Sequence, residues 1–119
     1  MSTIINCTPH DIIVQDRTGL MICHPKTNWV ARVETTQESA GDINGIPCFK
    51  TSYGNVTGFP DNEKFIEEIK SAGNRVFYIV SSLVKSACPN RDDLIVPDTG
   101  KTCIRDDAGK IIAVTQFIV

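Results

Sequence analysis

The stretch Arg75–Val119 reads RVFYIVSSLVKSACPNRDDLIVPDTGKTCIRDDAGKIIAVTQFIV and sets short apolar segments beside isolated polar groups. Arg75–Val80 is the clearest buried strand. Ser81–Ala87 is predicted as a short helix, because a serine can cap its start and Pro89 ends it. Further strands are predicted at Leu94–Pro97, Thr102–Arg105 and Lys110–Val119, with Asp107-Ala108-Gly109 as the turn before the last one.

Outward from this stretch, the preceding residues predict strands, turns and one more helix. Glu63–Ala72 has Phe65, Ile66 and Ile69 on one face, and Gly73 is a stop signal. Gln37–Gly45 is polar and contains glycine, so it is predicted as a loop or hairpin tip. Strands are predicted at Ile4–Cys7, Asp11–Val14, Leu20–Cys23, Trp29–Thr35, Ile46–Tyr53 and Asn55–Gly58. The fold class is therefore α+β, a single domain over 1–119 with a mainly antiparallel sheet and two short helices.

Charge excludes one class of partner. The net charge is −2, residues 1–59 carry 4 basic and 5 acidic groups, and residues 60–119 carry 8 and 9. Binding to a DNA or RNA polymer needs a basic excess that neither half has. A near-neutral chain of this kind favours a small-molecule partner.

The five cysteines form no C-x-x-C pair, and the start MSTIINCTPHDI lacks a basic segment followed by an apolar core. No apolar run approaches the roughly 20 residues that span a bilayer. These features predict a cytoplasmic protein with free thiols and no membrane association. No cofactor and no metal site is predicted.

Three arginines are candidate ligand contacts, and two of them, Arg91 and Arg105, stand where an apolar run ends and can reach an anion. Arg105 either grips an anion or forms a salt bridge with Asp106 or Asp107. Arg91, beside Asn90, stands in a similar position after the predicted short helix. Arg32 lies on a predicted strand among apolar residues, and it either contacts ligand or forms a salt bridge on the sheet face with Glu34 or a neighbour.

Other candidates are aromatic or hydroxyl-bearing. Phe77 and Tyr78 face opposite sides of one strand, so one belongs in the core and the other can stack on a planar base. Ser81 and Ser82 begin a helix directly after a strand, where free backbone N–H groups can seat a phosphate. His10 is a structural residue, a ligand contact or a catalytic base. No nucleophile–base pair or known catalytic motif is found, so no catalytic residue is assigned and binding without cleavage is favoured.

Several motifs occur in a recognisable order: NCTPHDIIV, WVARV, GNVTGFP, FYIVSSLVKSACPNRDDLIVPDTG and CIRDDAGKIIA. Over roughly Asn6 to Ala113 the chain resembles the Thoeris anti-defence sponge family of phages, of the first type described. That family sequesters cyclic ADP-ribose-type signals without hydrolysing them, and some members also bind cyclic oligonucleotides.

The resemblance implies a homo-oligomer, a dimer or a hexamer, that binds a small cyclic nucleotide in the host cytoplasm. It implies that Tyr78 stacks on the adenine, that Arg105 binds the pyrophosphate, and that Asn90 and Arg91 are polar contacts nearby. Two alternatives stay open: a small nucleotide hydrolase or phosphodiesterase that uses His10, and a structural phage protein that only oligomerises.

Overall fold

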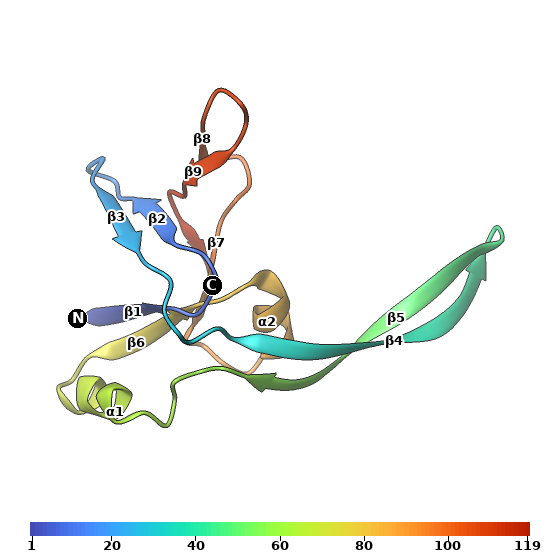
Figure 1. Cartoon of the computed structure of the whole chain (residues 1–119), viewed down its shortest axis with the longest axis horizontal. Helices are drawn as coiled ribbons and strands as arrows, with labels where there is room; N and C mark the ends of the chain where they lie inside the picture. The colour runs from blue at the N-terminus through green and yellow to red at the C-terminus, as the bar shows by residue number, and fades with distance from the viewer.

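The computed structural model describes all residues 1–119, and its centre is a four-stranded mixed sheet (Figure 1). The strand order is β1-β6-β7-β10; β1 and β6 are parallel, β6 and β7 are parallel, and β10 is antiparallel to β7. Ser2 pairs with Arg75, so the first strand joins the sheet only through residues that lie more than 70 positions later in the chain. The strands are β1 (Ser2–Asn6), β6 (Arg75–Ile79), β7 (Leu94–Pro97) and β10 (Phe117–Ile118).

The remaining strands form three separate antiparallel hairpins. They are β2 (Ile12–Gln15) with β3 (Met21–His24), β4 (Arg32–Ile43) with β5 (Ile46–Thr57), and β8 (Ile104–Arg105) with β9 (Ile111–Ala113). The predicted α+β class with mostly antiparallel pairing is confirmed. The central sheet differs from the pairing around it, because three of its four strands run parallel.

Two short helices flank the sheet strands: α1 (Lys64–Ser71) and α2 (Ser82–Ala87). Helix α1 ends where predicted, because Gly73 adopts φ +86° and its N–H donates to the carbonyl of Lys70. Helix α2 begins where predicted, because the Ser81 side chain accepts a hydrogen bond from the N–H of Val84. No helix of the structure combines the length and apolar character needed to cross a membrane.

The core is small and lies around β6. Only 16 of 119 residues are buried, and nine of them form one cluster where α1, α2, β6 and β7 meet. Parallel strands with cover on both faces are apolar throughout, which explains the unbroken run Val76–Val80. The buried cluster consists of Cys7, Ala31, Ile66, Val76, Tyr78, Val80, Val84, Leu94 and Val96.

The β4–β5 hairpin, here called the arm, extends far from this core (Figure 1). Of the two alternatives predicted for Gln37–Gly45, the hairpin tip is confirmed and the loop is wrong, because β4 continues to Ile43 and the turn contains only Asn44 and Gly45. Both turn residues have positive φ, as a tight hairpin turn requires. Cross-strand pairing therefore overrides the polar composition, and the segment predicted at Asn55–Gly58 is the end of β5.

A glycine fixes the root of the arm. Gly58 has φ +98°, and a Cβ there would lie 1.9 Å from the carbonyl oxygen of Val30. Only glycine fits this crossing of two backbones. The crossing fixes where the chain leaves the arm and returns to the core.

The predicted strand Lys110–Val119 is broken in two. Its first part, β9, pairs with β8, and its second part, β10, pairs with β7 of the same chain. Between them, the Thr115 hydroxyl donates to the carbonyl of Thr102, and the Gln116 amide donates to Asp98. These two polar residues change the direction of the chain, which its apolar composition did not predict.

Candidate functional site

A cavity of about 570 Å³ lies at the carboxyl ends of β1, β6 and β7. Residues directly after β1 and β6 and at the end of β7 form one side, and residues of β2 and β9 form the other. Ligands of open sheets with parallel strands commonly bind at this end of the strands. The volume falls within the range of small-molecule sites.

The lining of the cavity combines an apolar floor with a polar rim. Val80, Val96 and Ala113 are buried floor residues. The rim carries exposed side chains able to donate or accept hydrogen bonds: His10, Asp11, Ser81, Ser82 and Thr99. Such a surface can hold an apolar or planar group at the bottom and polar groups at the mouth. Two predicted site residues, His10 and Ser81, meet here although 71 positions separate them.

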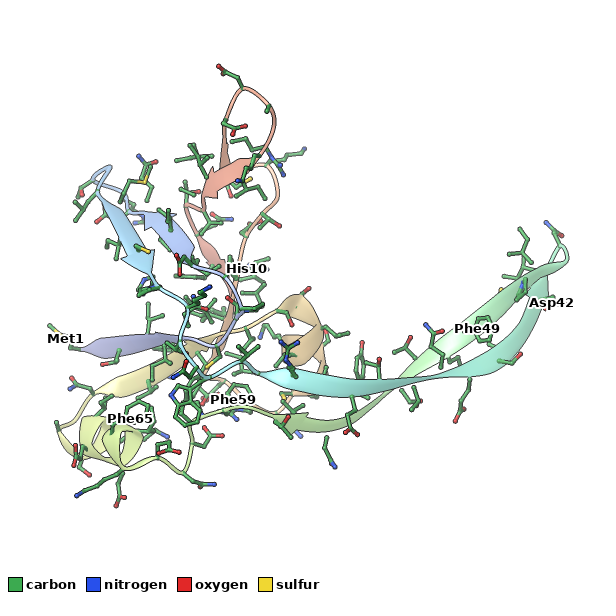
Figure 2. All side chains as sticks on the ribbon, viewed as in Figure 1. Met1, His10, Asp42, Phe49, Phe59 and Phe65 are labelled. Atoms are coloured by element: carbon green, nitrogen blue, oxygen red, sulfur yellow. The ribbon has the colours of Figure 1, made fainter.

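The loop that carries His10 is held by the buried side chain of Asn6. Its Nδ2 donates to the carbonyls of His10 at 2.7 Å and His24 at 2.9 Å. Its Oδ1 accepts from the N–H of Thr8 at 2.9 Å and from the Thr8 hydroxyl at 2.7 Å. The N-x-T-P-H motif is thus a hydrogen-bonded turn that presents Pro9 and His10 at the cavity (His10 is labelled in Figure 2).

Ser81 and Ser82 enter the lining from the strand-to-helix turn after β6. The Ser81 hydroxyl oxygen already accepts from the N–H of Val84 at 3.3 Å, so part of its hydrogen-bonding capacity caps α2. Its proton remains available as a donor toward the cavity. With six residues, α2 is too short to provide a substantial dipole of its own.

Arg105 is exposed at the end of β8 and links two segments near the cavity. Its Nη1 donates to the carbonyl of Gly109 at 2.7 Å, and its Nη2 donates to the carbonyl of Thr99 at 3.3 Å. Thr99 lines the cavity. No ion pair joins Arg105 to Asp106 or Asp107, so the salt bridge predicted as one alternative is absent.

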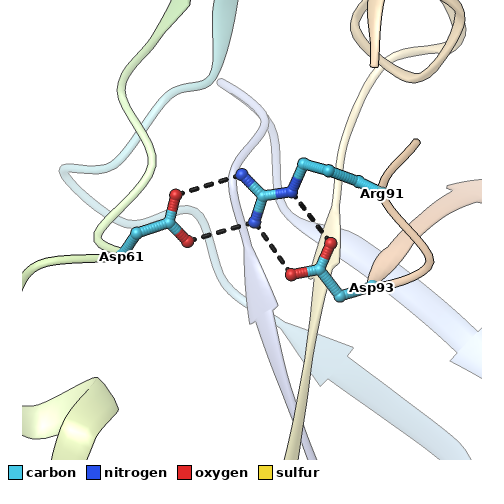
Figure 3. Close-up of polar contacts among 3 residues, drawn as sticks. All are labelled: Asp61, Arg91 and Asp93. Carbon is cyan, nitrogen blue, oxygen red and sulfur yellow. Dashed lines mark hydrogen bonds and ion pairs between the residues drawn. The ribbon is translucent and has the colours of Figure 1, made fainter. Parts of the chain in front are cut away.

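Arg91 lies outside the cavity, between two carboxylates (Figure 3). Its Nη1 and Nη2 each lie 3.0 Å from an oxygen of Asp61, and its Nε and Nη2 lie 2.9 and 2.8 Å from the two oxygens of Asp93. The hydrogen bonds from Arg91 hold the pKa of the Asp93 carboxyl below its usual range. With four of its five N–H groups bound to carboxylates of the same chain, Arg91 has one N–H group left for the predicted ligand contact.

Tyr78 is also placed differently from the prediction. Its side chain is 0% exposed, its ring meets the edge of Phe59 at 5.3 Å between centroids, and the Arg91 guanidinium lies 5.4 Å from it. Burial, followed by the nearby Asp61 carboxylate, raises the pKa of its hydroxyl, which has no hydrogen-bond partner. A ring enclosed in this way offers no free face, so stacking of an adenine on Tyr78 does not fit the protomer.

The other predicted residues do not line the cavity. Phe77 is half-buried on the opposite face of β6, and the Arg75 guanidinium lies 4.8 Å from its ring centroid. Asn90 is exposed in the loop after α2, and Arg32 is exposed at the start of β4. Of the eight predicted residues, the structure therefore brings His10 and Ser81 together and places Arg105 next to their cavity.

Sequence reasoning missed Asp11 and Thr99 on the rim and Ile111–Val114 on the wall. Asp11 stands directly after the T-P-H turn, which was a usable signal. Its Oδ1 accepts from the N–H of Lys26 at 2.8 Å, which ties the rim to the chain after β3. Nothing in the sequence indicated that β9 would face the end of β7.

Comparisons with known proteins find no match: no family model, no curated protein and no solved structure matches this chain.

No group of three or more histidine, cysteine or acidic side chains is arranged to hold a metal ion. All five thiols are free, and burial raises the pKa of Cys7 to about 11.

Proposed function

We propose that the protein sequesters, without cleaving it, a cyclic ADP-ribose-type immune signalling nucleotide, as an anti-defence protein of a phage acting in the host cytoplasm. One observation supports this function above the others. Motifs that lie far apart in the chain, N-x-T-P-H at 6–10, the serines after β6 and the arginine of R-D-x-x-G, converge around one cavity.

The chemistry of the cavity suits this ligand class. A cyclic ADP-ribose carries a planar adenine, ribose hydroxyls and a pyrophosphate. The floor of Val80 and Val96 suits the apolar face of a base, and hydroxyls at the rim suit the ribose. Arg105 uses two of its five N–H groups on carbonyls, so three remain for phosphate oxygens.

A second function has one observation in its favour. His10 lines the same cavity as two serine hydroxyls. An imidazole beside a hydroxyl can act as the general base that activates it, as in a hydrolase or phosphodiesterase. The two functions differ in what happens to the ligand. A sponge returns the nucleotide intact after denaturation, whereas a hydrolase returns cleaved product.

The test is a capture experiment with the product mixture of a TIR-domain enzyme. The protein is incubated with the mixture, recovered, washed and heated, and the released compounds are separated and identified by mass spectrometry. Release of an intact cyclic ADP-ribose isomer supports sequestration. Cleaved product supports the hydrolase, and release of no nucleotide supports a structural protein. Cyclic oligonucleotides are tried in a parallel incubation.

A matched pair of variants ties the result to the cavity. Ser82→Phe places a ring at the cavity rim, and Ser86→Phe places the same ring on an exposed position of α2 that does not line it. We expect Ser82→Phe to lose captured ligand and Ser86→Phe to keep it. Equal capture by both variants would move the ligand away from this cavity.

A further inference from the structure

The chain exposes more surface than a compact protein of its mass. Its accessible area is 8317 Å², whereas a compact monomer of 13.1 kDa exposes roughly 6,400 Å². Its radius of gyration is 17.2 Å against about 13.5 Å for a compact chain of this length. The excess of roughly 1,900 Å² falls within the range of surface area that each subunit of a permanent dimer buries at its interface. The arm accounts for the elongated shape (Figure 1).

Along most of its length, the arm is exposed and no other element of the chain packs against it. A two-stranded ribbon is marginally stable in water, and each strand leaves one edge of N–H and C=O groups unpaired. Phe49 is 58% exposed and Tyr53 is 45% exposed on one face of β5. Their cross-strand neighbours are the small residues Ser39 and Thr35 (Phe49 is labelled in Figure 2). The two aromatic rings therefore lack a large partner within the arm.

Symmetry limits how two arms can join edge to edge. If β4 of one copy paired with β5 of another, free edges would remain and further copies would add without closure. A closed dimer pairs like edge with like edge. Each β4 carries the acidic residues Glu34, Glu38 and Asp42 and one basic residue, Arg32, so an antiparallel β4–β4 pair brings together two strands of net charge −2, which like-charge repulsion disfavours.

The β5 edge avoids that repulsion, because Lys50 is its only charged residue. In an antiparallel pair centred on Thr51, Lys50 lies opposite Ser52 of the second copy. The same register sets Phe49 directly opposite Tyr53 of the second copy, and the symmetry axis repeats this aromatic pair. Aromatic cross-strand pairs are among the favourable contacts of antiparallel sheets.

We propose that two copies of this chain form a symmetric dimer by pairing their β5 strands antiparallel, centred on Thr51, into a four-stranded sheet. Pro47 falls at the ends of this pairing, where its missing N–H removes at most one hydrogen bond at each end. The β4 edges remain on the outside, where Glu38 and Asp42 oppose the addition of further copies. This interface does not depend on the cavity or its ligand.

The test uses two variants at cross-strand neighbours. Thr51 and Gln37 pair within the arm, so a glutamate at either position adds one carboxylate to the same cross-strand pair of the hairpin. Only Thr51→Glu places two carboxylates opposite each other on the proposed axis. We expect the wild-type chain to sediment as a dimer, Thr51→Glu to raise the dimer dissociation constant at least about tenfold, and Gln37→Glu to leave it nearly unchanged.

Hydrogen exchange on the wild-type chain provides a measurement that needs no variant. We expect amides of β5 to gain protection at concentrations where the dimer forms, with those of β4 gaining less. A wild-type monomer at all concentrations overturns the proposal, as does equal weakening by both variants, weakening by Gln37→Glu alone, or no weakening by Thr51→Glu. Protection confined to β4 or to the C-terminal β10 overturns it as well.

Discussion

The central sheet and the arm are both built from strands, yet the two regions keep their strands in place by different means. In the sheet, parallel strands are joined by residues far apart in sequence and covered by two helices, a buried cluster and the Asp61–Arg91–Asp93 network. In the arm, every pairing is local and nearly every side chain is exposed. A substitution in the sheet region should therefore change stability, and one on the β5 edge of the arm should change association.

The sharpest test of the sheet region is Arg91→Ala. It leaves Asp61 and Asp93 without their cation and removes the guanidinium that lies 4.2 Å from the Phe59 ring centroid. Since the three side chains are partly exposed, we expect a loss of about 3 kcal/mol in the free energy of unfolding, measured by urea denaturation. Lys64→Ala, which removes only an exposed pair with Glu68, is the control and should cost less than about 0.5 kcal/mol. Equal costs would show that the network does not stabilise the sheet.

Asn6→Ala tests whether the cavity loop depends on a buried amide. The change removes the amide donor from the carbonyls of His10 and His24 and the acceptor from the Thr8 N–H, and only the Thr8 hydroxyl still donates to the His10 carbonyl, so we expect a loss of about 2 kcal/mol in unfolding free energy. Amides of residues 8–11 should also exchange faster. Asn28→Ala, at an exposed position, should have almost no effect on either measurement. A stable Asn6→Ala protein with a protected loop would show that the turn forms without this side chain.

Arg105→Ala separates binding from stability. If Arg105 binds the pyrophosphate, the affinity for a cyclic ADP-ribose isomer falls more than about tenfold, or about 1.4 kcal/mol, while the fold remains intact. Calorimetry on the folded variant measures both. Unchanged affinity would restrict Arg105 to its contacts with Thr99 and Gly109 and would weaken the proposed ligand class.

Acid should weaken the sheet region through Asp93. Because Arg91 lowers the pKa of this carboxyl in the folded state, the stabilisation is present above its unfolded pKa of about 3.9 and is lost as the pH falls through the folded value. We expect the unfolding free energy to fall below about pH 4, and Arg91→Ala to lack most of that fall. Parallel pH curves for wild type and variant would contradict this.

The smallest effect is expected at the tip of the arm. Ile43 is 67% exposed, so Ile43→Ser should change the unfolding free energy by less than about 0.5 kcal/mol. It should leave the sedimentation of the wild-type dimer unchanged, because β5 and not β4 carries the proposed interface. A large loss of stability would mean that the tip is covered in solution.

Sequence patterns predicted the structural features that depend on residues close together in the sequence. The ends of both helices followed from Gly73 and Ser81, and the buried strand at Val76–Val80 followed from its apolar run. The parallel pairing of β1 with β6 did not follow, because a short apolar strand does not specify its partner. The length of β4 was missed because pairing with β5, and not composition, keeps Gln37–Ile43 extended.

The site was predictable only in part, for a related reason. His10 and Ser81 have polar side chains at the ends of strands, which is a local signal, and both line the cavity. Tyr78 and Arg91 carry the same chemical groups as ligand-binding residues, yet their surroundings use those groups internally. A single sequence does not show whether an arginine will meet carboxylates of its own chain.

The pairing of Ser2–Asn6 with Arg75–Ile79 has a consequence for synthesis on the ribosome. The first strand emerges early and has no partner until most of the chain has been translated. The hairpin of residues 32–57 needs only contacts within itself, so it can form on the nascent chain long before the sheet closes. During that interval two neighbouring nascent chains on one messenger RNA would present their hairpins to each other, while the cavity does not yet exist.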